Sequence, residues 1–220
     1  MTKKPIKRRK EGDAPVAPVA LGTRQRRGRE RRAEILKVAR KLFAQHGFRG
    51  TSLAMLAEIV GMTDAGLLYH FPSKNRLLLA VLEETDAAQE SRMAGGVDTS
   101  DASYISAWAE FGKVLEDDPV LTALDVLISA EHLQTESDFN EYFRKRYESF
   151  RKRLVRSFEA GRAAGVFRKD FDPHTEAVLM LATLDGLRLQ WLLSDGKISM
   201  ADAMRYFIRH MEARIRVQTK

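Results

Sequence analysis

The chain contains no cysteine among its 220 residues. Without thiols it can form no disulfide, thiolate zinc site or cysteine nucleophile, a composition that fits a reducing cytoplasm. No apolar run approaches the roughly 18 residues that a membrane-spanning helix needs. A clean apolar run such as Ala177 to Ala182 has only six residues. These absences predict a cytoplasmic protein that does not enter a membrane.

Proline is also scarce, with six residues, and polar and apolar residues do not alternate regularly. Both features argue against a β-sandwich or barrel, whose strands need a period of two and frequent turn residues. Apolar residues instead recur every three to four positions, which is the period of an α-helix. Hydrophobic residues make up 44% of the chain and charged residues 30%, as in ordinary soluble domains. We expect an all-α protein of about nine helices.

Motifs for catalysis and metal binding are missing as well. The sequence has no Gly-rich phosphate loop, nucleophile elbow or paired-carboxylate motif. His132 and His174 lie far apart, without the histidine–carboxylate spacing of a metal site. We therefore expect no metal, no cofactor and no enzymatic activity.

Positive charge is concentrated at the N-terminus. Residues 1–32 carry twelve Lys and Arg against three acidic residues, whereas the other 188 residues carry 25 basic and 27 acidic ones. Residues 1–28 have too little apolar surface to fold alone, so we predict a disordered basic arm. Such an arm either only improves solubility or contacts DNA phosphates and the minor groove. In the second case we expect contacts from the arginines nearest the first helix: Arg24, Arg26, Arg27 and Arg29.

The segment 51–74, TSLAMLAEIVGMTDAGLLYHFPSK, indicates two short helices joined by a tight turn. Thr51 is expected to cap the first helix and Thr63 the second, because a side-chain oxygen at these positions accepts a free backbone N–H. Gly61 supplies the left-handed backbone of the turn, and the second helix stops before Pro72. This pattern fits a DNA-binding helix-turn-helix, but the spacing alone fits a plain helical hairpin equally well.

Particular residues favour the first of these interpretations. The segment from Gly61 to Lys74 resembles the G-V-S-x-x-x-L-Y-x-H/Y-F-x-S-K signature of the tetracycline-repressor (TetR) family. Residues 32–48 before it resemble the first helix of that family, with the pattern A-x-x-L-F-x-x-x-G-F at 39–48. One position departs from the signature, because Leu68 stands where the family most often has tyrosine, and Tyr69 follows it.

The resemblance implies an organisation and a function. It implies an N-terminal three-helix DNA-binding domain, here residues 29–75, and a larger helical ligand-binding and dimerisation domain, here residues 76–220. It further implies a transcriptional regulator, in most members a repressor, that binds double-stranded DNA at a palindromic operator as a homodimer. The expected effector is a small apolar or aromatic molecule.

Base recognition is expected at the start of the second short helix, because that end enters the major groove. The four residues there are Thr63, Asp64, Ala65 and Gly66. Asp64 either accepts a hydrogen bond from a cytosine amino group or only supports helix capping. Phosphate contacts are expected from Thr51, Ser52, Tyr69, His70 and Lys74. On this division Lys74→Ala weakens binding to every sequence alike, whereas changes at Asp64 or Ala65 alter sequence preference.

The C-terminal half carries aromatic residues at helical spacing. By the family resemblance some of them line an effector cavity, although aromatic residues at this spacing are more often plain core. The candidate lining residues are Tyr104, Trp108, Phe111, Phe143, Tyr147, Met180 and Leu184. The helix expected over 137–164 also has a basic face, including 144–146 and 151–153, whose acidic neighbours indicate a solvated surface rather than a second DNA site.

The last two expected helices, 173–194 and 199–217, carry more apolar surface than one core needs. In TetR proteins the last two helices form a four-helix bundle with those of the partner subunit, so we expect the dimer interface there. The candidate interface residues are Leu181, Leu187, Trp191, Met204, Phe207, Ile208 and Met211. The alternative is a single buried core without a partner.

Two other classes of function stay open on the sequence. A sequence-indifferent DNA-organising protein accounts for the basic arm but not for the large apolar C-terminal half. A helical ligand carrier or enzyme accounts for the aromatic residues but has no use for a basic arm. We favour a sequence-specific, ligand-responsive repressor.

Overall fold

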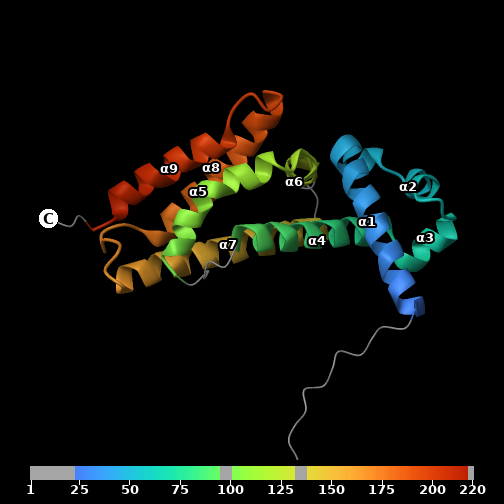
Figure 1. The fold of residues 1–220 in the computed structure, drawn as a ribbon, viewed down its shortest axis with the longest axis horizontal. Helices are drawn as coiled ribbons and strands as arrows, with labels where there is room; N and C mark the ends of the chain where they lie inside the picture. Colours follow the sequence, from blue (N-terminus) through green and yellow to red (C-terminus); the bar gives the residue numbers. More distant parts are fainter. Residues whose placement is uncertain (1–22, 95–100, 132–137, 218–220) are drawn as a thin grey trace, which may run out of the picture.

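The computed structural model describes residues 23–94, 101–131 and 138–217, and in these ranges it contains nine α-helices and no strand (Figure 1). The helices are α1 (Thr23–Gly50), α2 (Leu53–Ile59), α3 (Asp64–His70), α4 (Lys74–Ala94), α5 (Ser103–Glu116), α6 (Pro119–Glu131), α7 (Asp138–Ala163), α8 (Pro173–Leu193) and α9 (Met200–Ile215). Among these helices none is long and apolar enough to cross a membrane. The predicted all-α fold is confirmed.

Two adjoining apolar cores hold the helices together. The first contains residues of α1 to α4, together with Leu124 and Ile128 of α6 and Phe139 of α7. The second contains residues of α5, α7, α8 and α9 around Trp108. In Figure 1 the helices α1 to α3 lie at one end of the molecule, and the long helices α4 and α7 run along it, joined by ion pairs such as Arg153–Glu90.

Helix α6 connects these two parts, because it packs against α1 on one side and α8 on the other. The first core also continues past residue 75 into α4, where Leu77 and Leu82 are fully buried. The domain boundary expected after residue 75 therefore stays a prediction. What the packing shows is an N-terminal end, α1 to α4, whose core is shared with α6 and α7.

Helix α1 begins at Thr23 rather than at Arg29, which corrects the predicted start. Its first turns are polar and carry no apolar stripe, so apolar periodicity gave no sign of them. Arginine and glutamine nevertheless favour helix, and Arg26 lies 3.6 Å from Glu30 one turn later. Residues 23–28 are thus helical, and the rest of the predicted disordered arm, residues 1–22, lies outside the described part of the chain.

The first cap of the helix-turn-helix differs from the prediction. Ser52, not Thr51, is the N-cap of α2, and its side chain accepts the backbone N–H of Met55 at 3.1 Å. Thr51 is buried, and its hydroxyl donates to the carbonyl of Gly47 at 2.8 Å. The capping role expected of Thr51 therefore belongs to Ser52, because the Thr51 side chain is buried.

The turn and the second cap agree with the prediction. Gly61 follows α2 with a φ of 62°, a conformation that glycine adopts without strain. Thr63 caps α3 by accepting the backbone N–H of Gly66 at 3.1 Å. These two features set the angle between α2 and α3.

Gly112 lets α5 approach α9 closely. A Cβ atom placed on Gly112 would lie 2.5 Å from the carbonyl oxygen of Met200 and 2.8 Å from the backbone nitrogen of Ala201. Backbone atoms cannot rotate away, so Gly112→Ala is expected to lower the free energy of unfolding by about 1–3 kcal/mol, as other overpacked cores do. Urea denaturation measures this.

The matched control is Gly28→Ala in α1, where an added Cβ has no neighbour within 4 Å. Alanine there removes a helix-weakening glycine and is expected to stabilise by about 0.5–1 kcal/mol. Equal effects of the two substitutions would contradict the close α5–α9 approach.

Candidate DNA-binding surface and effector cavity

Helix α3 packs one side against the first core and exposes the other. Leu67 is fully buried, whereas Asp64 and Ala65 are exposed and Tyr69 exposes 84% of its surface. The oxygen of Thr63 accepts an N–H of its own helix, so its hydroxyl hydrogen remains available to a DNA group. A capped helix that begins with small and polar exposed side chains is suited to enter a major groove.

The other predicted contacts on α3 are less open. Gly66 and His70 are partly buried, and the ring of His70 makes an edge contact with Tyr69 at 5.5 Å. A Cβ added to Gly66 would lie 3.3 Å from the side chains of Met62 and Thr63. Gly66 therefore has a packing role within the turn, and its predicted approach to a base stays a prediction.

Of the two predicted contacts before α2, only Ser52 keeps its place. Ser52 is exposed, and its hydroxyl uses an acceptor lone pair for capping, which leaves its hydrogen for a phosphate. Thr51 is 2% exposed and donates its only hydroxyl hydrogen to Gly47. The Thr51 side chain therefore has no donor left for a phosphate, and this predicted contact is corrected.

Lys74 lies at a joint between α1, α2 and α4. Its Nζ donates to the carbonyls of Phe48 and Thr51, at 2.8 Å each, and lies 4.2 Å from the centre of the Phe48 ring. Partial burial lowers the pKa of Lys74, an effect that the negative charge of Glu131 opposes. We call Gly47 and Phe48 the elbow. One Nζ hydrogen remains for a phosphate, so that predicted contact stays a prediction, but holding the elbow is the role that the contacts show.

The elbow also contacts the C-terminal half directly. The carboxylate of Glu131, at the end of α6, accepts the backbone N–H of Phe48 at 2.7 Å. The Phe48 ring packs against Phe139 of α7 with ring centres 5.3 Å apart. Gly47 has φ 67° and ψ −178°, a conformation open in practice only to glycine. The joint between α1 and the helix-turn-helix therefore lies on α6 and α7.

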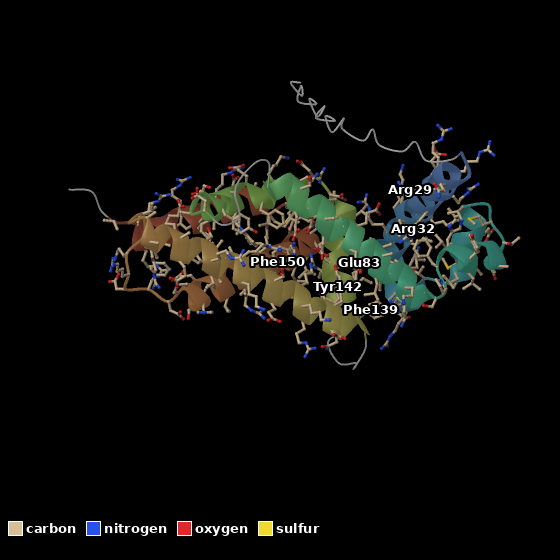
Figure 2. All side chains as sticks on the ribbon, turned by 90° about the horizontal axis from the view of Figure 1, so that it is seen from below. Arg29, Arg32, Glu83, Phe139, Tyr142 and Phe150 are labelled. Carbon is tan, nitrogen blue, oxygen red and sulfur yellow. The ribbon has the colours of Figure 1, made fainter. Side chains whose placement is uncertain are left out.

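The arginines predicted to contact DNA lie on the first turns of α1. Arg26, Arg27 and Arg29 are exposed, and Figure 2 shows Arg29 and Arg32 along α1 at the end that carries α2 and α3. Arg24 belongs to α1 as well, but its side chain lies outside the described part. These arginines are held by a helix, and their contact with DNA stays a prediction.

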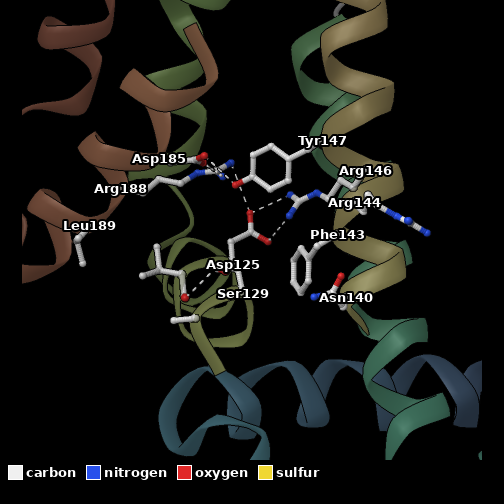
Figure 3. Close-up of a pocket in the computed structure, with 12 residues that line it drawn as sticks. Asp125, Ser129, Asn140, Phe143, Arg144, Arg146, Tyr147, Asp185, Arg188 and Leu189 are labelled. Carbon is white, nitrogen blue, oxygen red and sulfur yellow. Dashed lines mark hydrogen bonds and ion pairs between the residues drawn. The ribbon is translucent and has the colours of Figure 1, made fainter. Parts of the chain in front are cut away.

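A cavity of about 540 Å³ lies between α6, α7 and α8 (Figure 3). Its volume is within the range of small-molecule sites, about 300–1,000 Å³. Val126 and Ala130 of α6, Phe143 of α7 and Leu189 of α8 contribute apolar walls. The cavity is thus large enough and apolar enough for an organic molecule.

Asp125 is the centre of a buried ion-pair network in the wall of this cavity. Arg146 donates to its two oxygens at 3.2 and 3.0 Å and pairs with Asp86 of α4 at 2.8 Å. Arg188 lies 3.4 Å from Asp125 and 3.5 Å from Asp185. Burial acts to raise the pKa of Asp125, but the charges of Arg146 and Arg188 outweigh it and hold that pKa below its ordinary value.

Two tyrosines extend this network. Tyr147 donates its hydroxyl to Asp185 at 2.8 Å, and Tyr142 donates to Asp86. Burial raises the pKa of both carboxyl groups above the ordinary value, although Tyr147 and Arg188 oppose this at Asp185 and Arg146 and Tyr142 at Asp86. The network joins α4, α6, α7 and α8 around one wall of the cavity.

Two of the seven predicted lining residues border this cavity, and their contact with an effector stays a prediction. Phe143 and Tyr147 line the cavity, at its α7 side. The other five predicted residues are buried in the second core, and three of them border a void of about 10 Å³, hardly room for one water. These five are Tyr104, Trp108, Phe111, Met180 and Leu184. Their aromatic and apolar side chains fill the space between α5, α8 and α9.

The sequence did not predict the charged residues that line the cavity, because charged side chains are usually exposed. Arg146 was placed on the solvated face of its helix, but its side chain is 7% exposed. A signal was present in the spacing, since Arg146 falls beside the apolar stripe of Phe143 and Phe150. Asp125 likewise interrupts the stripe of Leu124 and Ile128. A charged residue inside an apolar stripe predicts a buried pair, whose partner only the fold identifies.

Burial also corrects the expected dimer interface. Four of its seven residues are 6% exposed or less and pack in the protomer's own second core: Leu181, Met204, Ile208 and Met211. Leu187, Trp191 and Phe207 are partly buried and remain candidates. The apolar residues left exposed on α8 and α9 are Val178, Leu179, Leu189, Leu193 and Tyr206.

Two family models match this chain. The one for "Bacterial regulatory proteins, tetR family" matches residues 35–81, which include α2 and α3. The one for "BetI-type transcriptional repressor, C-terminal" matches residues 106–216, half of the chain.

Similar proteins include two curated regulators and a solved structure. The chain is 43% identical over 63 residues to the HTH-type transcriptional regulator RutR of Escherichia coli, covering 29% of this chain and only 30% of RutR. It is 26% identical over 190 residues to the HTH-type transcriptional repressor AcnR of Corynebacterium jeikeium, covering 80% of this chain and 89% of AcnR. A putative transcriptional regulator from Saccharomonospora viridis in complex with choline shares the fold, with a TM-score of 0.71, 23% identity, and coverage of 86% of this chain and 100% of that one. On its helix-turn-helix, its C-terminal match and its fold, this chain belongs to the TetR family of bacterial transcriptional regulators.

Proposed function

We propose that this chain is a sequence-specific transcriptional repressor, which binds a palindromic operator as a homodimer and releases it when a small molecule enters the cavity. The observation that carries the proposal is α3, whose cap and buried Leu67 fix it in place while Asp64, Ala65 and Tyr69 face outward. Exposed arginines on α1 supply positive charge for the phosphates beside it. The relatives named as regulators support the same function.

A second copy of the chain fits the exposed apolar surface of α8 and α9. Leu193 exposes 77% of its surface, Tyr206 63% and Val178 51%, which is costly for a protein that stays a monomer. Pairing these helices with their copies buries that surface. In such a dimer the two α3 helices enter successive major grooves, about 34–36 Å apart or a multiple of it.

Helix α6 provides a physical route from the cavity to the DNA-binding end. Asp125, in its middle, belongs to the cavity wall. Asp118, just before its first residue, pairs with Arg40 of α1 at 3.3 Å, and Glu131, at its last residue, holds the elbow. A molecule that shifts α6 therefore acts on α1 at two points, which supports a coupling between effector and operator binding.

The test is a mobility shift at physiological salt, with the DNA upstream of the protein's own gene and a scrambled duplex of equal length. A repressor is expected to prefer its operator by about 10³-fold or more. Binding of equal strength to both duplexes would favour the alternative, a sequence-indifferent DNA-organising protein.

Substitutions at the DNA-binding end separate phosphate contacts from base contacts. Arg29→Ala is expected to weaken binding to operator and scrambled DNA by the same factor and to reduce the salt dependence of binding by about one unit of slope. Asp64→Asn is expected to change the ratio between the two duplexes, by about 1–3 kcal/mol at the base pair that it faces. Fluorescence anisotropy titrations at several salt concentrations measure both effects.

Arg156→Ala on α7 serves as the control for Arg29, because it removes an exposed arginine from the C-terminal half. It is expected to leave both affinities unchanged. Equal losses on both duplexes for Arg29→Ala and Asp64→Asn would overturn the division of roles.

A further inference from the structure

The cavity wall contains a buried cation whose hydrogen bonds are incomplete. Arg188 is 6% exposed, yet within the described residues it makes only two long ion pairs, 3.4 Å to Asp125 and 3.5 Å to Asp185. Its buried Nε has no hydrogen-bond partner there. Arginine carries five N–H donors, and a buried donor without an acceptor is costly. Arg188 lines the cavity, and its two terminal nitrogens make only these long ion pairs, so an acceptor that enters there can approach them (Figure 3).

The neighbouring carboxylates already have close donors, whereas Arg146 has two close carboxylate partners and, like Arg188, an Nε without a partner. Asp125 accepts two close contacts from Arg146, and Asp185 accepts the hydroxyl of Tyr147 at 2.8 Å. The hydroxyl of Ser129 donates to the carbonyl of Asp125 at 2.7 Å. A molecule entering the cavity thus meets satisfied acceptors and an unsatisfied arginine fork. The missing partner is an acceptor.

We propose that the effector of this cavity is an amphipathic organic acid, whose single carboxylate pairs with the guanidinium of Arg188 while its apolar body lies against Val126, Phe143 and Leu189. The proposal rests on the function proposed above and specifies its effector. A carboxylate matches the arginine fork with two parallel N–H···O bonds, so it supplies the acceptors that Arg188 lacks. The apolar walls and the volume of about 540 Å³ accommodate the rest of the molecule.

The charges around Arg188 further restrict the chemical class of the effector. Asp125 and Asp185 already lie within 3.5 Å of this guanidinium, so a second negative charge on the effector is repelled. A monocarboxylate is therefore favoured over a phosphate ester or a dicarboxylate. A cationic effector is disfavoured because Arg144, Arg146 and Arg188 all line the cavity.

The experiment is isothermal titration of the delipidated full chain with three molecules of equal length: decanoate, decanamide and decyltrimethylammonium, each below its micelle concentration. Naphthaleneacetate and its amide form a second, aromatic pair. At least one acid is expected to bind about ten times more tightly or better than its amide, the ratio of a charge-assisted pair worth about 1.5–3 kcal/mol. The ammonium compound is expected to bind more weakly than decanoate.

Variants assign the preference to Arg188. Arg188→Lys keeps the charge but loses the fork, and it is expected to reduce the acid-to-amide ratio severalfold. Arg156→Lys, at an exposed site of α7 outside this cavity, is the matched control and is expected to leave the ratio unchanged. Circular dichroism checks that each variant folds. Ala130→Trp, which fills an apolar wall, is expected to abolish binding of acid and amide and provides a second test if Arg188→Lys does not fold.

The outcomes separate this proposal from the proposed repressor. Three results would overturn the carboxylate effector. The first is that neither acid binds, and the second is that an amide or the ammonium compound binds as tightly as the acid. The third is an acid-to-amide ratio that Arg188→Lys leaves unaltered. The repressor function would still stand on operator binding. Conversely, Arg188-dependent acid binding without any DNA preference would keep the effector class and overturn the repressor.

Discussion

Asp125→Ala is expected to lower the free energy of unfolding by about 3–5 kcal/mol, the cost of breaking a buried ion pair from one side. The carboxylate of Asp125 is the acceptor for both Arg146 and Arg188, whose side chains are only 7% exposed. Without it, Arg146 keeps Asp86 at 2.8 Å, but Arg188 keeps only its 3.5 Å contact with Asp185. Two arginines that cannot lose their charge are then poorly compensated in the interior. Urea denaturation at one fixed protein concentration measures the difference.

The control for this change is Asp117→Ala. Asp117 pairs with Lys113 at 2.7 Å, but both side chains are more than half exposed, so the loss is expected to be much smaller than that of Asp125→Ala. A loss at Asp125 as small as that at Asp117 would show that Asp86 and Asp185 suffice to hold the two arginines.

The ion pairs of Asp125 also predict that the stability of the chain depends on pH. Because the pKa of folded Asp125 lies below its ordinary value of about 3.9, its contribution to stability is present above that pH and is lost as the pH falls through the folded pKa. Asp86 and Asp185 have raised pKa values, so each lowers the free energy of unfolding as the pH rises above the ordinary carboxyl pKa. The wild-type chain is therefore expected to lose more stability on acidification below about pH 4 than Asp125→Ala does.

Gly47→Ala is expected to destabilise the chain by about 2–5 kcal/mol, because it combines two penalties. Alanine at φ 67° and ψ −178° is strained, which costs about 1–3 kcal/mol. A Cβ at this site would also lie 2.5 Å from Oε1 of Glu131, whose carboxylate is held by the N–H of Phe48. To relieve the collision, the end of the Glu131 side chain must shift, which weakens its hydrogen bond to Phe48. Operator affinity is expected to fall together with stability, because the elbow sets the position of α2 and α3.

Gly61→Ala is a control for a positive φ without a collision. Gly61 has φ 62°, but an added Cβ there has no neighbour within 4 Å. It is expected to show the strain without the collision. The double variant Gly47→Ala with Glu131→Ala is expected to regain the free energy of unfolding lost to the collision, but not that lost to backbone strain. If Gly47→Ala and Gly61→Ala cost the same, Glu131 moves aside freely and does not hold the elbow.

The elbow is also the place where variants test the proposed regulation most directly. It is held at once by Lys74 of α4, Glu131 of α6 and Phe139 of α7. Each of these helices also contributes to the network around Asp125 or to the cavity beside it. A change in the cavity is therefore connected to the elbow through these three helices and their non-covalent contacts with it.

The helices themselves followed from local rules in the sequence. The capping residue Thr63, the glycine at 61 and the proline at 72 act within a few residues of one another, so the helix-turn-helix was predicted nearly to the residue. Apolar spacing likewise predicted the helices α7, α8 and α9. It missed the first turns of α1, because a solvated helix of arginine and glutamine carries no apolar stripe.

The candidate sites were predicted less completely. The exposed start of α3 was found, because groove contacts come from consecutive residues of one helix. The cavity was not, apart from Phe143 and Tyr147, since its walls come from three helices separated by dozens of residues. Which of several apolar positions face a void, rather than another side chain, depends on how those helices cross.

The sequence by itself therefore determined the all-α fold, the helix-turn-helix and the family, because each rests on interactions among near neighbours or on a contiguous motif. Tertiary structure alone decided that Thr51 turns inward, that Lys74 and Glu131 hold the elbow, and that Asp125, Arg146 and Arg188 meet in the wall of the cavity. A charged side chain is buried only where a partner from another helix compensates it. That partner is defined by packing in three dimensions, and no local pattern in the chain specifies it.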